Sequence, residues 1–380
     1  MNFINDGTMK IDFVITELFV GGAERCLTEL ATAMTVAGDE VRVFSIGSLP
    51  GGQQSLLVDR LQAAGIEVES GRADSIWQFP SAKRRLQDWM LSSPADVCQT
   101  FLFHANVIGT WAAVSADIPI RVGGLRVADA NPIRCPIERS AIKRMTSVTC
   151  VSEAVQSFAA KRLRCPTDKS IVIPNGVDVS RFSTGNPFDW TTLGWPAETA
   201  AALFVGRLHP QKGIDLLQQQ ISAIAPARTN RKLLIVGDGP DRDAIDRWCE
   251  EIGSDRVQRM PWQSDVAPLM RACRVLILPS RYEGMPNVAM EAMAAGRPVV
   301  CSRAEGSAEL LSHDWQKQTF DIGDGPAMAN LANAFLTDAA RANQVGEINR
   351  ARMRNDFSLP AMVDAYRSHY RLLRTRRLDV

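Results

Sequence analysis

Residues 275–301, VLILPSRYEGMPNVAMEAMAAGRPVVC, carry the clearest fold signal in the chain. The stretch opens with the apolar run Val275–Leu278 and closes with a second apolar run at 299–301. Between them lies a helical pattern, with Pro286 near its first position and Gly296 just past its end, where helices favour these residues. A strand, a helix and a second strand in this order are typical of an α/β protein with a parallel sheet.

The same alternation continues on both sides of this stretch. In the first half we predict strands at 11–15, 41–46, 97–101, 121–124, 147–151 and 170–173. The helices between them are predicted at 23–37, 53–64, 81–92, 105–116, 135–145 and 153–163. In the second half we predict strands at 202–205, 233–236, 257–260, 275–278 and 299–301, then only helices over roughly 325–377. The fold class is therefore α/β, with two Rossmann-like doubly wound parallel-sheet domains facing a cleft and a C-terminal helical tail.

The domain boundaries follow from where this alternation stops. We expect an N-terminal domain over 1–179, a linker over 180–200, a C-terminal domain over 201–350 and a C-terminal helix over 351–380 that returns to the N-terminal domain. Residues 1–8 are expected to be a disordered extension, which leaves both Met1 and Met9 open as the start. Doubly wound sheets bind ligands at the carboxyl ends of their strands, so we expect the site in the cleft between the domains.

Composition excludes several classes of protein. Apolar residues make up 46% and charged residues 22%, which is typical of a soluble globular protein and not of a disordered or collagen-like chain. Lys and Arg number 43 against 42 Asp and Glu, so no overall positive field would recruit nucleic acid. The eight cysteines form no C-x-x-C pair, which indicates reduced thiols and a cytoplasmic protein. We find no targeting signal, and the long uncharged stretch at 97–116 divides into a strand and a helix.

The turn before the helix of the opening stretch is a candidate anion site. The amides of Met285, Asn287 and Val288 stand at a helix N-terminus, where unpaired N–H groups and the helix dipole favour phosphate. Glu283 and Glu291 would flank that anion. They are about 12 Å apart along a helix, too far for a glycosidase pair. An ordinary acidic preference at a helix start is the alternative.

Two more glycine turns follow predicted strands. Gly206 ends the strand at 202–205 and is followed by two cations, Arg207 and Lys212, that could both reach one diphosphate. Two solvated loop cations are the alternative. Gly21 and Gly22 follow the first strand and allow a ligand to approach the backbone closely. Neither turn has the order of a P-loop or of a dinucleotide fingerprint.

These motifs together carry a family resemblance. In chain order they are Gly21-Gly22-Ala23-Glu24, Ile173-Pro174-Asn175-Gly176-Val177-Asp178, Gly206-Arg207…Lys212-Gly213 and Glu283…Glu291. Their spacing resembles glycosyltransferase family 4, the group 1 glycosyltransferases, which are retaining, nucleotide-sugar-dependent enzymes with the GT-B fold. The resemblance covers nearly the whole chain.

The resemblance implies a role for each matching residue. Glu283 would bind hydroxyls of the donor sugar and Glu291 the ribose of the nucleotide. Arg207 and Lys212 would neutralise the diphosphate, helped by Gly22 and by the amides after Glu283, which lie in the segment Gly284-Met285-Pro286-Asn287-Val288. Pro286 stands where the family often has another glycine, which removes one amide donor. Asn175-Gly176 would be an interdomain turn.

Two aromatic residues complete the expected donor site. In the family a histidine placed like His104 touches the donor sugar near the reacting carbon; a core histidine is equally open at this position. Trp262 follows the strand at 257–260 and would stack on the nucleobase, with core packing as the alternative.

We expect no cofactor and no metal. Asp241 and Asp243 match a D-x-D metal motif, but they begin a predicted helix, where acidic residues are favoured anyway. The implied reaction is a front-face substitution, in which the diphosphate leaves towards the cations and takes the proton of the acceptor. The donor would be UDP-linked, by family habit. A nucleotide-sugar epimerase or phosphorylase on the same fold, or a non-catalytic nucleotide-sugar-binding protein, are the alternatives.

The acceptor side is less defined. Family habit points to a glycan or a lipid-linked acceptor in cell-surface polysaccharide or glycolipid synthesis, with no nucleic acid partner. Residues 132–164 hold seven basic and two acidic groups, among them Arg139, Lys143 and Arg144. Such helices in the family often lie on anionic membranes, so a peripheral contact with the inner face of the membrane is a further expectation. A solvated helix face is the alternative.

Overall fold

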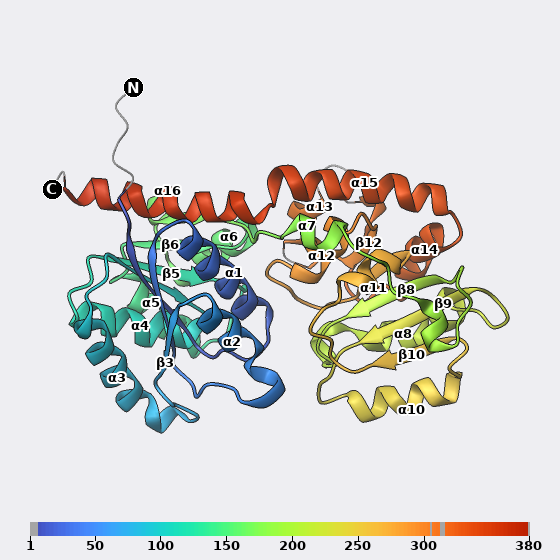
Figure 1. Ribbon diagram of the computed structural model, residues 1–380, viewed down its shortest axis with the longest axis horizontal. Helices are drawn as coiled ribbons and strands as arrows, with labels where there is room; N and C mark the ends of the chain where they lie inside the picture. The colour runs from blue at the N-terminus through green and yellow to red at the C-terminus, as the bar shows by residue number, and fades with distance from the viewer. Residues whose placement is uncertain (1–6, 305, 312–315, 379–380) are drawn as a thin grey trace. The chain divides into compact units, whose positions relative to one another are not determined.

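The computed structural model describes residues 7–304, 306–311 and 316–378 of the chain. The chain divides into two compact units (Figure 1). Unit 1 consists of two segments, the chain up to Gly176 and the chain from Leu359 onward. Unit 2 is the segment between them, Val177–Ser358. Of the extension expected at 1–8, residues 1–6 lie outside the described residues.

Unit 1 is a seven-stranded parallel sheet covered by helices on both faces. The strands are β1 (Lys10–Ile15), β2 (Glu40–Ser45), β3 (Glu67–Ser70), β4 (Val97–Phe101), β5 (Ile120–Leu125), β6 (Ser147–Cys150) and β7 (Ser170–Val172). Their order in the sheet is β3-β2-β1-β4-β5-β6-β7. The helices are α1 (Gly22–Val36), α2 (Leu56–Ala63), α3 (Phe79–Ser92), α4 (Phe103–Ser115), α5 (Arg134–Ile142), α6 (Glu153–Leu163) and α16 (Leu359–Leu378).

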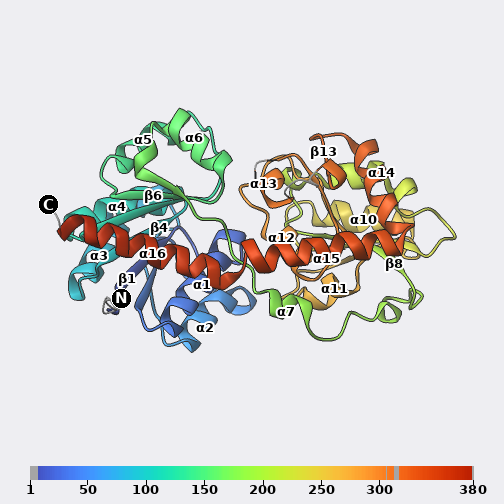
Figure 2. The same cartoon turned by 90° about the horizontal axis from the view of Figure 1, so that it is seen from above.

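Alternation along β1 explains how this sheet fills two cores. Ile11, Phe13 and Ile15 pack with α1, α2 and α16 on one face, whereas Val14 packs with α3 and α4 on the other. Figures 1 and 2 show α16 running beside α1, and its Tyr366 is fully buried there. The last helix is therefore part of the core of unit 1.

Unit 2 is a six-stranded parallel sheet. The strands are β8 (Ala200–Val205), β9 (Arg231–Val236), β10 (Val257–Met260), β11 (Val275–Leu278), β12 (Val299–Ser302) and β13 (Thr319–Phe320), in the order β10-β9-β8-β11-β12-β13. One core lies under α8 (Ile214–Gln219), α9 (Ile221–Ile224), α10 (Arg242–Ile252) and α14 (Gly325–Leu336). The other helices are α7 (Val179–Ser183), α11 (Ala267–Ala272), α12 (Asn287–Ala294), α13 (Ser307–Leu311) and α15 (Ala339–Asp356). Figure 2 shows α15 lying across α12.

This architecture confirms the predicted fold class, two parallel-sheet Rossmann-like domains with a helical C-terminal tail. Every predicted strand is present within one or two residues of its predicted bounds. Two strands were not predicted, β3 and β13. β3 is a polar edge strand, EVES, and β13 has only two residues, so neither produces a run of apolar residues.

Residues 180–200, expected to be a linker, instead pack into unit 2. They include α7 and a 3₁₀ turn at Trp190–Leu193, and the side chains of Phe182, Trp190 and Trp195 are buried. The indole nitrogen of Trp195 donates a hydrogen bond to the Ser254 carbonyl over 2.7 Å. This stretch contains Gly and Pro and has no periodic apolar pattern, so the sequence does not predict that it is buried. Its large aromatic side chains nevertheless bury it.

Two further observations cover both units. In the described part of the chain, no helix combines the length and the apolar composition needed to cross a membrane. All eight cysteines are buried and unpaired.

Candidate functional site

Strand order places the predicted donor residues of unit 2 at one point of the sheet. β8 and β11 are neighbours, and the chain proceeds outward from them in opposite directions. Such a switch point is where doubly wound sheets bind ligands, beyond the carboxyl ends of the strands. The loop after β8 (206–213, the lysine loop) and the loop after β11 (279–286, the glutamate loop) both begin there.

The two loops bring Lys212 and Glu283 together. The Lys212 ammonium donates a short hydrogen bond to Oε1 of Glu283, and their side chains are 20% and 13% exposed. A Cβ on Gly206 would lie 3.9 Å from Cδ of Lys212, so the lysine stem passes over this glycine. Gly213 has a φ of +67°, and a Cβ there would come within 2.0 Å of the Pro279 carbonyl oxygen. The loops are therefore in backbone contact.

Helix α12 begins directly beyond Glu283. Pro286 is its N-cap residue, with extended backbone angles and no side-chain cap. The amides of Asn287 and Val288 therefore belong to the first turn, as expected from the sequence. Glu291 is four residues after Asn287, on the same helix face, and it is buried. Gly284 packs under Gly306, where a Cβ would be 2.2 Å from the Gly284 carbonyl oxygen. Met285 is also buried.

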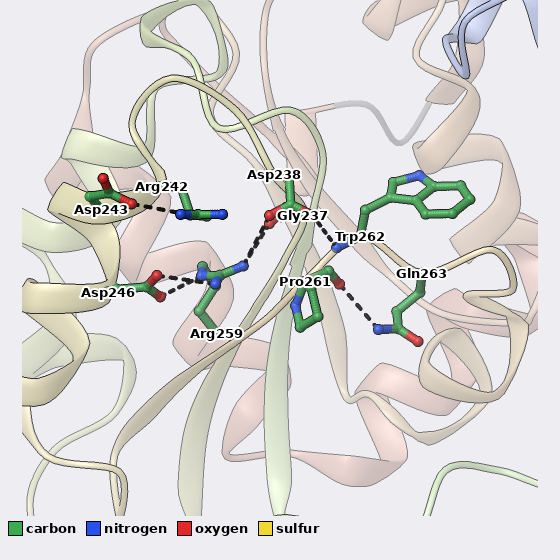
Figure 3. Close-up of polar contacts among 9 residues, drawn as sticks. All are labelled: Gly237, Asp238, Arg242, Asp243, Asp246, Arg259, Pro261, Trp262 and Gln263. Carbon is green, nitrogen blue, oxygen red and sulfur yellow. Dashed lines mark hydrogen bonds and ion pairs between the residues drawn. The ribbon is translucent and has the colours of Figure 1, made fainter. Parts of the chain in front are cut away.

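Trp262, which follows β10, and the loop after β9 lie at the carboxyl ends of the two strands beyond β8 (Figure 3). The Asp238 carboxylate accepts a hydrogen bond from the Trp262 amide over 2.7 Å. Arg259 of β10 bridges Asp238, in the loop after β9, and Asp246 of α10. The Trp262 side chain is 37% exposed, so it is not a core residue. The core-packing alternative does not hold for this tryptophan.

Arg207 and the D-x-D residues are not part of the Lys212–Glu283 contact. Arg207 is on the surface, and Leu208 beside it is buried against the loop after β9. Asp243 contacts Arg242 over 3.1 Å (Figure 3). Asp241 is the N-cap residue of α10, but its side chain makes no capping hydrogen bond. Among residues 7–304, 306–311 and 316–378, no three His, Cys, Asp or Glu side chains are grouped to hold a metal ion.

Unit 1 has its own switch point, between β1 and β4. Gly21 and Gly22 follow β1, and His104 is the second residue of α4, which follows β4. The Ala105 amide donates to the hydroxyl of Thr16 over 3.4 Å, which joins the two loops. The structure therefore brings the glycine pair and His104 to the same edge of this sheet.

His104 is half-buried between two phenylalanines. Its ring centroid is 5.2 Å from that of Phe79 and 5.1 Å from that of Phe103. Burial, assisted by the nearby charge of Arg134, lowers the pKa of His104 and so favours the neutral ring. It is neither a core histidine nor a freely solvated one.

Two buried acids in this unit had no predicted role. Glu24 lies against the glycine pair, since a Cβ on Gly21 would come within 2.2 Å of its Oε2. Burial raises the pKa of Glu24 to about 7. Glu138 accepts a hydrogen bond from Asn106 over 2.9 Å, and burial raises its pKa to about 7 as well. Glu24 is part of the Gly-Gly-Ala-Glu motif, but nothing local in the sequence marks Glu138, which lies within a helix.

Asn175 lies at the boundary between the two units, where an interdomain turn was expected, and its side chain is buried. Its Oδ1 accepts a short hydrogen bond from the buried Arg126 and another from the Cys26 thiol over 3.4 Å. Asn175 therefore holds the end of the first segment of unit 1, which closes at Gly176, by buried hydrogen bonds. The signal for Arg126 is present in the sequence, a cation directly after an apolar strand.

The basic helices at 132–164 use part of their charge internally. Arg139 donates from Nε to the Arg162 carbonyl over 2.8 Å, and Arg144 stacks over Trp111 at 3.8 Å. Lys143 is exposed. The basic surface is therefore smaller than the residue count suggests.

Comparison with known proteins relates the whole chain to one group of enzymes. Residues 20–181 match the family described as Glycosyltransferase Family 4, and residues 199–338 match Glycosyl transferases group 1. The chain is 24% identical to the lipopolysaccharide core biosynthesis glycosyltransferase LpsD of Rhizobium meliloti, over 91% of this chain and 94% of that protein. It is 27% identical to the Escherichia coli UDP-Gal:alpha-D-GlcNAc-diphosphoundecaprenol alpha-1,3-galactosyltransferase, over 72% and 75%.

Solved structures support the same fold. Anabaena Alr3699/HepE in complex with UDP superimposes with a TM-score of 0.81 at 23% identity, covering 95% of this chain and 99% of that one. WaaG, a glycosyltransferase involved in lipopolysaccharide biosynthesis, gives a TM-score of 0.72 at 17% identity, with 95% and 99% coverage. With both halves matched in chain order, the protein belongs to the family 4, group 1 glycosyltransferases of the GT-B fold.

Proposed function

We propose that this glycosyltransferase is a retaining enzyme that transfers a sugar from a UDP-linked donor to a hydroxyl of a glycan or lipid-linked acceptor. The observation that carries the proposal is the pairing of Lys212 with Glu283 beside the start of α12. A cation suits a phosphate group and a carboxylate suits sugar hydroxyls, so this one point would hold the diphosphate and the sugar of a donor.

The other residues near the carboxyl ends of the strands would bind the rest of the donor. Arg207 and Lys212, with the amides of Met285, Asn287 and Val288 and the dipole of α12, would bind the diphosphate. Glu291 would bind the ribose, and the half-exposed Trp262 would stack on the base. In unit 1, the Gly21 and Gly22 backbone would approach the phosphate, and neutral His104 would contact the sugar.

The reaction requires no cofactor in this proposal. The bond between the anomeric carbon and the diphosphate breaks, and the acceptor oxygen attacks from the same face, which retains the configuration. The acceptor proton passes to a leaving phosphate oxygen. Arg207, Lys212 and the start of α12 would stabilise the growing negative charge, so the residues themselves supply the positive charge that the leaving group needs.

The relatives favour an acceptor of the cell envelope. Their names include lipopolysaccharide core biosynthesis, a diphosphoundecaprenol substrate and phosphatidyl-myo-inositol. We place the enzyme in the cytoplasm, since all eight cysteines are unpaired thiols. A peripheral contact with the inner face of the membrane is the remaining part of the proposal; the exposed Trp77 and Ile133 of unit 1 are suited to it.

The first experiment is a thermal-shift and calorimetric screen with UDP, GDP, ADP and their common sugar conjugates. UDP compounds should stabilise the wild type by about 3 kcal/mol at a hundredfold excess over Kd, and Glu291→Gln should weaken this effect. Glu251→Gln, an exposed acid on α10, is the control and should leave binding unchanged. Absence of binding by any nucleotide would contradict the proposed donor site.

A further inference from the structure

Four hydrogen bonds join the segment 210–215, which contains Lys212 and the start of α8, to the glutamate loop outside the Lys212–Glu283 pair. The Arg281 guanidinium donates from Nη2 to Asp215 over 2.8 Å and from Nη1 to the Pro210 carbonyl. The Arg281 amide donates to the Gln211 carbonyl over 2.8 Å. The Gln211 side chain in turn donates to the Tyr282 carbonyl over 3.0 Å. Arg281 takes part in three of these bonds.

These contacts enclose Lys212 on both sides along the chain. Pro210 and Gln211 come directly before the lysine, and Asp215 follows it by three residues, in the first turn of α8. On the other loop, Arg281 is two residues before Glu283. A shift of one loop relative to the other would therefore disturb the bonds to Arg281 as well as the contact of the ammonium with the carboxylate.

The exposure of Arg281 argues against a purely structural role for this residue. The side chains of Arg281 and Asp215 are 43% and 45% exposed. Ion pairs that are this accessible to water contribute little to the stability of a fold. The position of a charge in an active site is far more sensitive, because a displacement of about 1 Å is enough to reduce turnover by about a hundredfold.

We propose that Arg281 is a positioning residue of the donor site. Together with Asp215 it fixes the lysine loop on the glutamate loop, so that the Lys212 ammonium stands where the leaving diphosphate develops its charge. This inference rests on the proposed function, because it assigns Arg281 an effect that acts through Lys212.

The test compares Arg281→Ala with the wild type, using release of UDP from UDP-glucose as the probe reaction. The kcat should fall by about tenfold or more, while Tm changes by no more than about 1 °C. Arg281→Lys should be intermediate, since one ammonium cannot replace both side-chain bonds. Arg181→Ala is the matched control, because it breaks a half-exposed ion pair with Asp265 in the same unit, and neither residue belongs to the two loops.

A double variant distinguishes positioning from an independent effect. In a Lys212→Ala background, Arg281→Ala should cause no further loss of kcat, because the group that it positions is absent. An equal loss in both backgrounds, or a fall in Tm that parallels the loss of kcat, would overturn the inference.

A readout without turnover separates this inference from the proposed function. Labelling of Lys212 by an amine-reactive ester, followed by mass spectrometry, should be about threefold faster in Arg281→Ala, because the loop is less restrained. Labelling in Arg181→Ala should match the wild type. A wild type that neither binds UDP nor releases it contradicts the proposed function, and the labelling rates then decide on the contacts of Arg281 alone. Equal rates in all three proteins would overturn the role of Arg281.

Discussion

Lys212 is the residue on which the proposed chemistry depends most directly. Its side chain is mostly buried and contacts Glu283 at the switch point between β8 and β11. Lys212→Ala should reduce kcat by about a hundredfold or more, since it removes a charge held close to the leaving group. Steady-state kinetics with the donor identified by the binding screen would measure this. Lys317→Ala removes an exposed lysine of the same unit and should have no effect. Turnover close to that of the wild type in Lys212→Ala would refute the role.

Glu24 gives the stability of the protein a pH dependence of known sign. Burial raises its pKa from 4.5 to about 7, so the folded chain holds a proton that the unfolded chain has released at pH 6. The stabilisation is complete below about pH 4.5 and is lost as the pH rises through 7. The loss amounts to about 3 kcal/mol.

Thermal unfolding at pH 5 and pH 8 tests this dependence. Glu24→Gln carries no titratable group and should lose less stability between these pH values than the wild type does. The exposed Glu251→Gln serves as the control and should follow the wild type. The same loss of stability in all three proteins would contradict the assignment to Glu24.

Residues next to a strand end were predictable, whereas residues buried by distant segments were not. Lys212 and Glu283 follow apolar strands with glycine turns, so the sequence places them at a sheet edge. The buried Glu24 feels the charge of Arg126, which in turn donates to Asn175, and both of these residues are distant from it in sequence. The contacts of Arg281 likewise depend on how two loops that are distant in sequence pack together. A local sequence pattern cannot predict such contacts.

The close approach of α15 to α12 depends on a glycine. A Cβ on Gly346, in the middle of α15, would come within 1.9 Å of the Gly296 carbonyl oxygen just after α12. Alanine in a helix interior usually stabilises by about 1 kcal/mol relative to glycine. Gly346→Ala should instead destabilise unit 2 by about 1–3 kcal/mol, because backbone atoms must move apart.

Denaturant unfolding would measure this change. Gly51→Ala is a suitable control, since a Cβ there meets nothing within 4 Å. A more stable Gly346→Ala protein would show that the helices adjust without cost.

Apolar periodicity determined which elements were predictable. The strands of both sheets are continuous apolar runs because both of their faces are covered. β3 and β13 are short and lie at sheet edges, so they have no such run. The segment 180–200 shows the opposite case, in which two buried tryptophans hold an irregular stretch against unit 2.

Each unit has its own core, so each should respond to its own substitutions. The core of unit 1 includes α16 from the far end of the chain, with Tyr366 and Tyr370 fully buried. The Tyr370 hydroxyl also donates to Gln99 of β4 over 2.9 Å. Tyr370→Ala should therefore destabilise unit 1 by about 3–5 kcal/mol, through lost burial and a cavity.

Scanning calorimetry of the full chain with and without UDP would separate the two units. Tyr370→Ala should lower the transition of unit 1 by about 10 °C, and UDP should still raise that of unit 2, because the proposed base and phosphate contacts lie mainly there. Leu372→Ala, at a half-exposed position of the same helix, should leave both transitions unchanged. If Tyr370→Ala lowered both transitions equally, the two cores would unfold as one cooperative structure. The C-terminal helix would then stabilise the donor-binding unit as well as the unit into which it packs.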